Sequence, residues 1–121
     1  VKTQYTVHVG TQDFIDSIER VSLLITDRLK SPVKCLFLPD KIHLSCNTTV
    51  GKASDQLLAK SDIKTELEIA FNNKYMTDAL KNTDCDEIII QLNGPLSPIK
   101  IMPKEGNSFL FLVLPVRIKS E

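Results

Sequence analysis

The sequence has few of the residues and patterns that define the specialised classes of protein. Its 121 residues include only four glycines and six prolines, and 15 basic residues balance 15 acidic ones. So little glycine and proline excludes a collagen-like or low-complexity chain. A formal charge of zero excludes a domain that holds nucleic acid through a basic field alone. No apolar run approaches the roughly 18 residues of a membrane span, and no signal-peptide pattern opens the chain.

Length and cysteine content set the remaining bounds. A chain of this length suffices for one domain with its own core and is short for two. Its three cysteines, Cys35, Cys46 and Cys85, form no CxxC pair, which fits neither a disulfide framework nor a zinc site. We therefore expect a single soluble domain with structural thiols in a reducing compartment. Because the chain starts at Val1 and not at methionine, we also expect a fragment of a longer protein.

Hydrophobic periods recur in the same order in both halves of the chain. The first half predicts a strand, a helix and three strands, at residues 5–9, 11 to about 26, 33–38, 42–46 and 51–60. The second half predicts the same order at residues 67–71, 73–81, 87–92, 98–102 and 108–117. Repeats at about 1–60 and 61–121 predict an α+β fold, in which a duplicated β-α-β-β-β unit packs two helices side by side on antiparallel sheets.

Local patterns add detail to this outline. Thr11 and Asn72 can cap the two helices, because both side chains offer an acceptor to a first-turn N–H. The second helix is expected to bury Tyr75, Met76, Ala79 and Leu80. The polar segment 51–60 is typical of an edge strand. Residues 109–114 are apolar on both phases, so we expect both faces of that strand to be covered.

The sequence offers little catalytic chemistry. It contains no GxSxG, GxGxxG or Walker motif, so the usual nucleophile and nucleotide sites lack their parts. His8 and His43 have no partners at metal-ligand spacing. Asp84, Asp86 and Glu87 form an acidic cluster that is either a solvated turn or a cation site. Pattern alone thus favours an α+β interaction module, and the alternative is a small metal- or nucleotide-dependent enzyme domain that uses these acids or a histidine.

Two proline-containing segments are candidates for a binding groove. Residues 94–98, with the sequence GPLSP, form a turn in which two prolines flank a leucine. At residues 114–118, LPVRI, a proline interrupts strand pairing while apolar residues continue. Such residues either line a groove for a peptide or belong to a plain connection and the end of the core.

Three segments together carry a resemblance to a known family. They are IAFNNKYMTDAL at 69–80, LNGPLSPIKI at 92–101 and LPVR at 114–117. In this order and at these separations they resemble the third, C-terminal domain of the bacterial DNA sliding clamp, the beta subunit of DNA polymerase III. The resemblance covers essentially the whole chain.

The resemblance implies a non-catalytic processivity factor of DNA replication that needs no cofactor and acts in the cytoplasm. Such a clamp is a head-to-tail ring of two subunits with three domains each, closed around double-stranded DNA that it binds without sequence preference. The implied partners are the DNA polymerase III subunits, the clamp loader and other proteins with clamp-binding peptides. A ring of this kind raises the effective concentration of polymerase at the template.

The resemblance also implies which residues meet these partners. The third-domain side of the peptide-binding cleft corresponds to Asn72, Tyr75, Leu96, Pro98, Leu112, Leu114, Pro115, Val116, Arg117 and Ile118. Clamp-binding peptides carry aliphatic or aromatic anchors and a glutamine, which suit apolar walls with a few polar groups. The subunit interface would include Leu24, Ile25 and the edge strand near 51–56. Because the two helices are not strongly basic, we expect most attraction to DNA to come from other domains.

Overall fold

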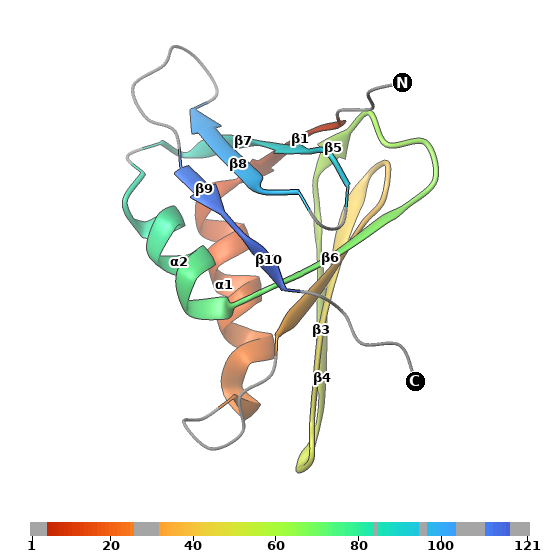
Figure 1. Ribbon diagram of the computed structural model, residues 1–121, viewed down its shortest axis with the longest axis vertical. Helices are drawn as coiled ribbons and strands as arrows, with labels where there is room; N and C mark the ends of the chain where they lie inside the picture. Colours follow the sequence, from red (N-terminus) through yellow and green to blue (C-terminus); the bar gives the residue numbers. More distant parts are fainter. Residues whose placement is uncertain (1–4, 26–31, 84, 95–96, 104–110, 117–121) are drawn as a thin grey trace.

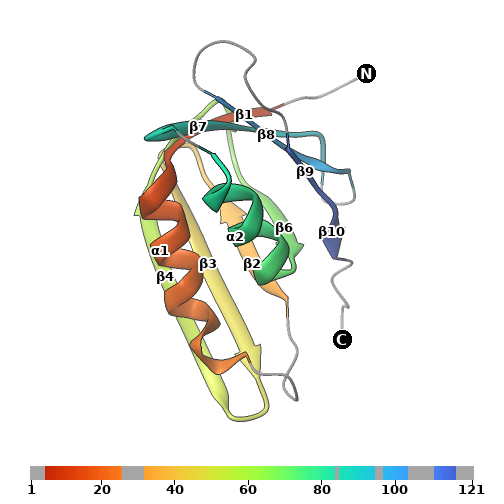
Figure 2. The same cartoon turned by 90° about the vertical axis from the view of Figure 1, so that its left-hand side faces the viewer.

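The computed structural model describes residues 5–25, 32–83, 85–94, 97–103 and 111–116, which form two antiparallel five-stranded sheets and two α-helices. The helices lie side by side in the angle between the sheets (Figures 1 and 2). They are α1 (Thr11–Val21), which continues into the 3-10 turn η1 (Ser22–Leu24), and α2 (Asn73–Lys81). The strands are β1 (Tyr5–Gly10), β2 (Val33–Phe37), β3 (Lys41–Thr48), β4 (Gly51–Leu58), β5 (Lys60–Ser61), β6 (Leu67–Phe71), β7 (Glu87–Leu92), β8 (Ile99–Pro103), β9 (Phe111–Val113) and β10 (Pro115–Val116). The predicted α+β class is confirmed.

Each half of the chain adds its first strand to the sheet of the other half. The strand order is β5-β1-β7-β8-β9 in one sheet and β10-β6-β2-β3-β4 in the other. Exchanging β1 with β6, and β2 to β5 with β7 to β10, converts one order into the other. Strand β4 lies at an edge, as its polar sequence predicted.

The core lies between the helices and the inner faces of the two sheets. Alternate residues of β2, β3, β7 and β8 are buried, as are Phe14, Ile18 and Val21 along one face of α1. Each fully buried side chain of this size contributes about 1.5–3 kcal/mol to stability. Cys35 and Cys46 are buried in this core, where burial raises the pKa of both thiols, so they pack as apolar groups.

The two helix starts differ in how they are capped. Asn72 accepts a hydrogen bond from the Tyr75 backbone N–H at 3.1 Å, as predicted. The prediction for Thr11 is wrong, because Gly10 occupies the cap position of α1 and Thr11 is the first helical residue. Helix α1 ends earlier than expected, at Val21, and η1 continues the chain to Leu24; residues 26–31 lie outside the described part.

The predicted C-terminal strand is two strands in different sheets. β9 pairs with β8 and β10 pairs with β6, and Leu114 lies between them. Pro115 has no N–H with which to continue the β8–β9 ladder. The expectation that both faces would be covered is wrong, since Leu112 is 60% and Leu114 is 70% exposed. A hydrophobic run predicts burial only where another element covers it, and in the described part nothing covers this outer face.

Two further expectations need correction. Met76 and Leu80 of α2 are buried and Ala79 is partly buried, but Tyr75 is 68% exposed. The buried face of helix α2 is narrow, and Tyr75 lies outside it. The predicted strand 51–60 also divides, because the chain leaves β4 after Leu58 and pairs with β1 through β5.

Within the described residues, neither helix is long and apolar enough to cross a membrane.

Candidate functional site

An apolar groove runs between helix α2 and the crossing from β9 to β10. Its volume is about 430 Å³. It is lined by Asn72, Tyr75, Ala79, Phe111, Leu112, Val113, Leu114, Pro115 and Val116. We call this set the α2–β9 groove.

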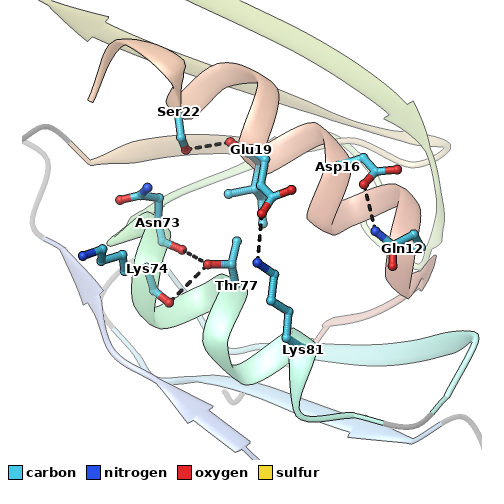
Figure 3. A network of polar contacts seen from close by, with 9 residues as sticks. Gln12, Asp16, Glu19, Ser22, Asn73, Lys74, Thr77 and Lys81 are labelled. Atoms are coloured by element: carbon cyan, nitrogen blue, oxygen red, sulfur yellow. Dashed lines mark hydrogen bonds and ion pairs between the residues drawn. The ribbon is translucent and has the colours of Figure 1, made fainter. Parts of the chain in front are cut away.

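Helix α2 supplies one wall, and its first turn is fixed by hydrogen bonds. The Asn72 amide oxygen caps the helix, and the Thr77 hydroxyl donates to the carbonyls of Asn73 at 2.9 Å and Lys74 at 3.3 Å (Figure 3). Buried Met76 anchors the same turn to the core. Tyr75 is thereby held on the exposed side of a rigid turn, with its ring available to a ligand.

The crossing strands supply the opposite wall. Val113 is buried, whereas the neighbouring Leu112 and Leu114 are exposed. Pro115 then pairs with Phe71, the last residue of β6, which lies just before the start of α2. Several exposed apolar side chains gathered at one hollow are uncommon on a surface that binds nothing.

The electrostatics of the groove suit binding and not reaction. None of its nine lining residues carries an ionisable acid, amine, guanidinium or imidazole group. The side-chain polar groups are the Asn72 amide and the Tyr75 hydroxyl, which can hydrogen-bond a polar group among apolar anchors. The groove can therefore hold an uncharged, largely apolar segment.

The structure brings six of the ten predicted cleft residues together: Asn72, Tyr75, Leu112, Leu114, Pro115 and Val116. Pro98 is exposed just before β8 and is not part of the lining. Leu96, Arg117 and Ile118 lie outside the described residues. That these residues bind a peptide remains a prediction.

Three lining residues were not predicted as part of the site: Ala79, Phe111 and Val113. A signal for Ala79 was present, because it follows Tyr75 by four residues and so lies on the same face of α2. Phe111 and Val113 border Leu112 in the same short strand. Their position at the groove depended on the strand crossing, which the sequence did not reveal.

A second hollow, of about 460 Å³, lies where α1 begins and α2 ends. Asp86 lines it, and exposed Glu87 begins β7 nearby, while Asp84 is outside the described part. In the described ranges no group of three His, Cys, Asp or Glu side chains could hold a metal ion. His8 is exposed and His43 half-buried, on strands of different sheets. No described feature supports the enzyme alternative.

The residues expected at a subunit interface lie at one side of the molecule. Ile25 is half-buried just after η1, which ends at Leu24, and among the described strands none pairs with the outer long side of β4 at the sheet edge. Leu23 and Leu58 are 80% and 85% exposed near these elements. Their contact with another subunit remains a prediction.

Three charged side chains of the helices form ion pairs within the domain: Glu19, Arg20 and Lys81. Lys81 of α2 donates to Glu19 of α1 at 3.0 Å across the two helices (Figure 3). On the other side of α1, the Ser17 hydroxyl donates to Asp55 of β4 at 2.7 Å, and Arg20 Nε donates to the same oxygen at 2.9 Å. The Ser17 hydrogen bond and the Arg20 guanidinium hold the pKa of Asp55 below its usual value. With four acidic residues against three basic ones, the two helices carry no excess of positive charge.

Comparison with known proteins gives consistent matches along nearly the whole chain. The family model described as "DNA polymerase III beta subunit, C-terminal domain" matches residues 2–117. The beta sliding clamp of Staphylococcus epidermidis is 32% identical over 116 residues, which are 93% of this chain and 31% of that protein.

Solved structures match the fold at similar identity. The DNA polymerase sliding clamp of Bacillus subtilis has a TM-score of 0.89 and 32% identity, covering 97% of this chain and 31% of that one. The DnaN sliding clamp of Bartonella birtlesii, described as bound to griselimycin, has a TM-score of 0.86 and 30% identity, covering 94% and 30%. This chain thus spans about a third of the length of the relatives that it matches.

Proposed function

Because the chain belongs to the family of the C-terminal domain of the DNA polymerase III beta subunit, we propose that it works as part of a sliding clamp, the processivity factor of DNA replication. It would form the third domain of a three-domain subunit in the cytoplasm. Two such subunits would close head to tail around double-stranded DNA. The domain catalyses no reaction in this proposal; it contributes a section of the ring and a binding site.

The observation that carries the proposal is the α2–β9 groove. It gathers Tyr75, Leu112 and Leu114, which are all exposed although they are large and apolar. While they are exposed to water they add no hydrophobic stabilisation to the fold, whereas covering them with an apolar ligand lowers the free energy. We propose that this groove receives the clamp-binding peptides of DNA polymerase III subunits, of the clamp loader and of other partners, with the neighbouring domain completing the cleft.

The ring itself would close through the unpaired side of β4 together with Leu24 and Ile25. An eight-residue edge strand offers backbone groups to a strand of the adjoining subunit. DNA would be held by enclosure and not by strong attraction to this domain, because Glu19 and Asp55 already pair with Lys81 and Arg20. Weak, sequence-independent attraction is compatible with sliding.

A peptide-binding assay tests the proposal. The probe is a fluorescein-labelled peptide with one glutamine and adjacent aliphatic and aromatic anchors, titrated with the chain and followed by anisotropy. The variant Tyr75→Ala with Leu114→Ala should bind at least about tenfold more weakly, since buried anchor contacts contribute about 1–3 kcal/mol each. Its melting temperature should stay close to that of the parent, because both side chains are exposed.

The matched control is Leu58→Ala, which removes an even more exposed leucine outside the groove. It should leave the affinity unchanged. Equal binding by the groove variant and the parent chain would contradict the assignment of the groove.

A further inference from the structure

The pairing registers relate the residues of the two halves one by one. Following directly opposed residues across each sheet gives two corresponding rows, Val7–Ile90–Ile101–Phe111 and Ile69–Cys35–Leu44–Asp55. In each row the first residue comes from the strand before a helix and the last from the strand that ends the three-strand meander. Phe111 of β9 therefore occupies the position that Asp55 occupies in β4.

The helices correspond in the same way. Helix α1 begins at Thr11 directly after β1, and α2 begins at Asn73 one residue after β6. Both cap positions, Gly10 and Asn72, are extended backbone. Counting from the first helical residue, Ser17 of α1 corresponds to Ala79 of α2. Ser17 and Asp55, where α1 meets β4, thus correspond to Ala79 and Phe111, where α2 meets β9.

These matching pairs differ in chemistry. In the first half, fully buried Ser17 donates to Asp55 at 2.7 Å, and Arg20 donates to the same carboxylate. The helix and the strand are thereby joined by charge-assisted hydrogen bonds. In the second half Ala79 and Phe111 have no side-chain donor or acceptor, and both line the α2–β9 groove.

Two of three flanking positions change in the same direction. The register that matches Asp55 with Phe111 also matches Gln56 with Leu112 and Leu58 with Leu114. Helix counting matches Asp13 with Tyr75. At two of these three flanking places the first half has a polar or acidic residue where the groove has a large apolar one.

We propose that the replacement of a hydrogen-bonded Ser–Asp pair by Ala79 and Phe111 is what leaves the second junction open, and that these two residues position the apolar anchor of the bound segment. Ala79 has no hydroxyl with which to bond the strand, and the phenyl ring of Phe111 puts a larger, apolar surface where the first half has a carboxylate that accepts from the helix. The anchor that fits is an uncharged aliphatic or aromatic side chain. The identity of the ligand in this inference rests on the proposed function. The explanation of why the groove is open does not depend on that function.

A double-mutant cycle tests the inference. The chain is prepared as Ala79→Ser, as Phe111→Asp and as the double variant, and each is measured for thermal unfolding and for affinity toward the labelled peptide. In the double variant the new hydroxyl can donate to the new carboxylate, as Ser17 does to Asp55. The melting temperature of the double variant should then exceed the additive value by about 2 °C or more, and its peptide affinity should fall at least about tenfold.

The control is the first-half pair Ser17→Ala with Asp55→Asn, which removes the original hydrogen bond and should change peptide affinity less than twofold. Additive melting temperatures across the cycle, or unchanged affinity in the double variant, would overturn the inference.

A crystal structure of the double variant separates this inference from the proposed function. A hydrogen bond between the introduced groups, with helix α2 drawn closer to β9 than in the parent chain, supports the inference even if the parent chain binds no peptide, in which case the proposed function alone fails. A double variant in which α2 and β9 keep their parent separation and no such hydrogen bond forms contradicts the inference whatever the peptide does.

Discussion

Some residues of the groove stabilise the fold and also form part of the binding surface. Asn72 satisfies a first-turn N–H of α2 and also lines the groove. Tyr75 receives its position from that cap and from buried Met76 in the same turn. The groove is therefore held on a helix whose start is fixed, so a ligand meets a preformed surface and loses little free energy in ordering it.

Asp55 provides a pH-dependent test at the residue scale. Because its pKa is lowered in the folded chain, first by the Ser17 hydrogen bond and then by Arg20, its ionised form stabilises the fold. This contribution is present above the unfolded pKa of about 4 and is lost as the pH falls through the lower folded value. We expect Asp55→Asn to lower the free energy of unfolding by about 1 kcal/mol at pH 7.

Urea denaturation of the parent and the variant at pH 7 and at pH 2.5–3 measures this, and the difference should shrink at the acidic pH. Asp40→Asn, whose carboxylate lies on an exposed turn, is the matched control and should show a much smaller difference. An Asp55→Asn difference that persists or grows at acidic pH would contradict the assigned role of the carboxylate.

At the scale of elements, apolar packing and not the visible ion pair holds the two helices. The Glu19–Lys81 pair joins α1 to α2, but both side chains are more than half exposed. Exposed pairs of this kind contribute little because water and salt screen them. Ile18, by contrast, is fully buried on α1.

The expected consequence is a large difference between two neighbouring substitutions. Glu19→Gln should change the free energy of unfolding by less than about 0.5 kcal/mol, whereas Ile18→Ala should lower it by about 2–4 kcal/mol. Chemical denaturation of both variants under the same conditions measures the contrast. A loss at Glu19 as large as that at Ile18 would show that the helix pair depends on the ion pair.

Several helices and strands could be predicted from the sequence alone. Clean alternation located β3, the apolar segments located β2 and β7 to within one residue, and the Asn72 cap with its apolar spacing located α2 to the residue. These signals are local, so they survive without knowledge of the tertiary fold. The resemblance supplied most of the groove residues, since composition alone left the groove as one of two alternatives.

What could not be predicted depends on partners far away in sequence. The division of 108–117 into β9 and β10 follows from β10 pairing with β6, and the exposure of Leu112 from the absence of a described covering element. The Ser17–Asp55 hydrogen bond joins residues 38 positions apart. Helical spacing alone also misplaced Tyr75, because it fixes which residues share a face and not how wide the buried part of that face is.

At the scale of the whole molecule, the exchange of first strands ties the two halves into one unit. Each sheet contains strands from both halves, so neither half can complete its sheet alone. The crossings at Leu58 to Lys60 and at Leu114 lie at corresponding places, and the α2–β9 groove lies beside the second. The two halves of a pseudo-symmetric scaffold thus differ in the surface that they present at this place.

Whether a partner peptide binds in the α2–β9 groove can be measured by an NMR titration. The backbone amide signals of the ¹⁵N-labelled chain are followed as the unlabelled glutamine-containing peptide is added. We expect saturable shifts concentrated at Asn72, Tyr75, Ala79 and residues 111–116, with little change along β4 or at the hollow beside Thr11. Saturable shifts centred on that second hollow, with the groove signals unmoved, would contradict this expectation.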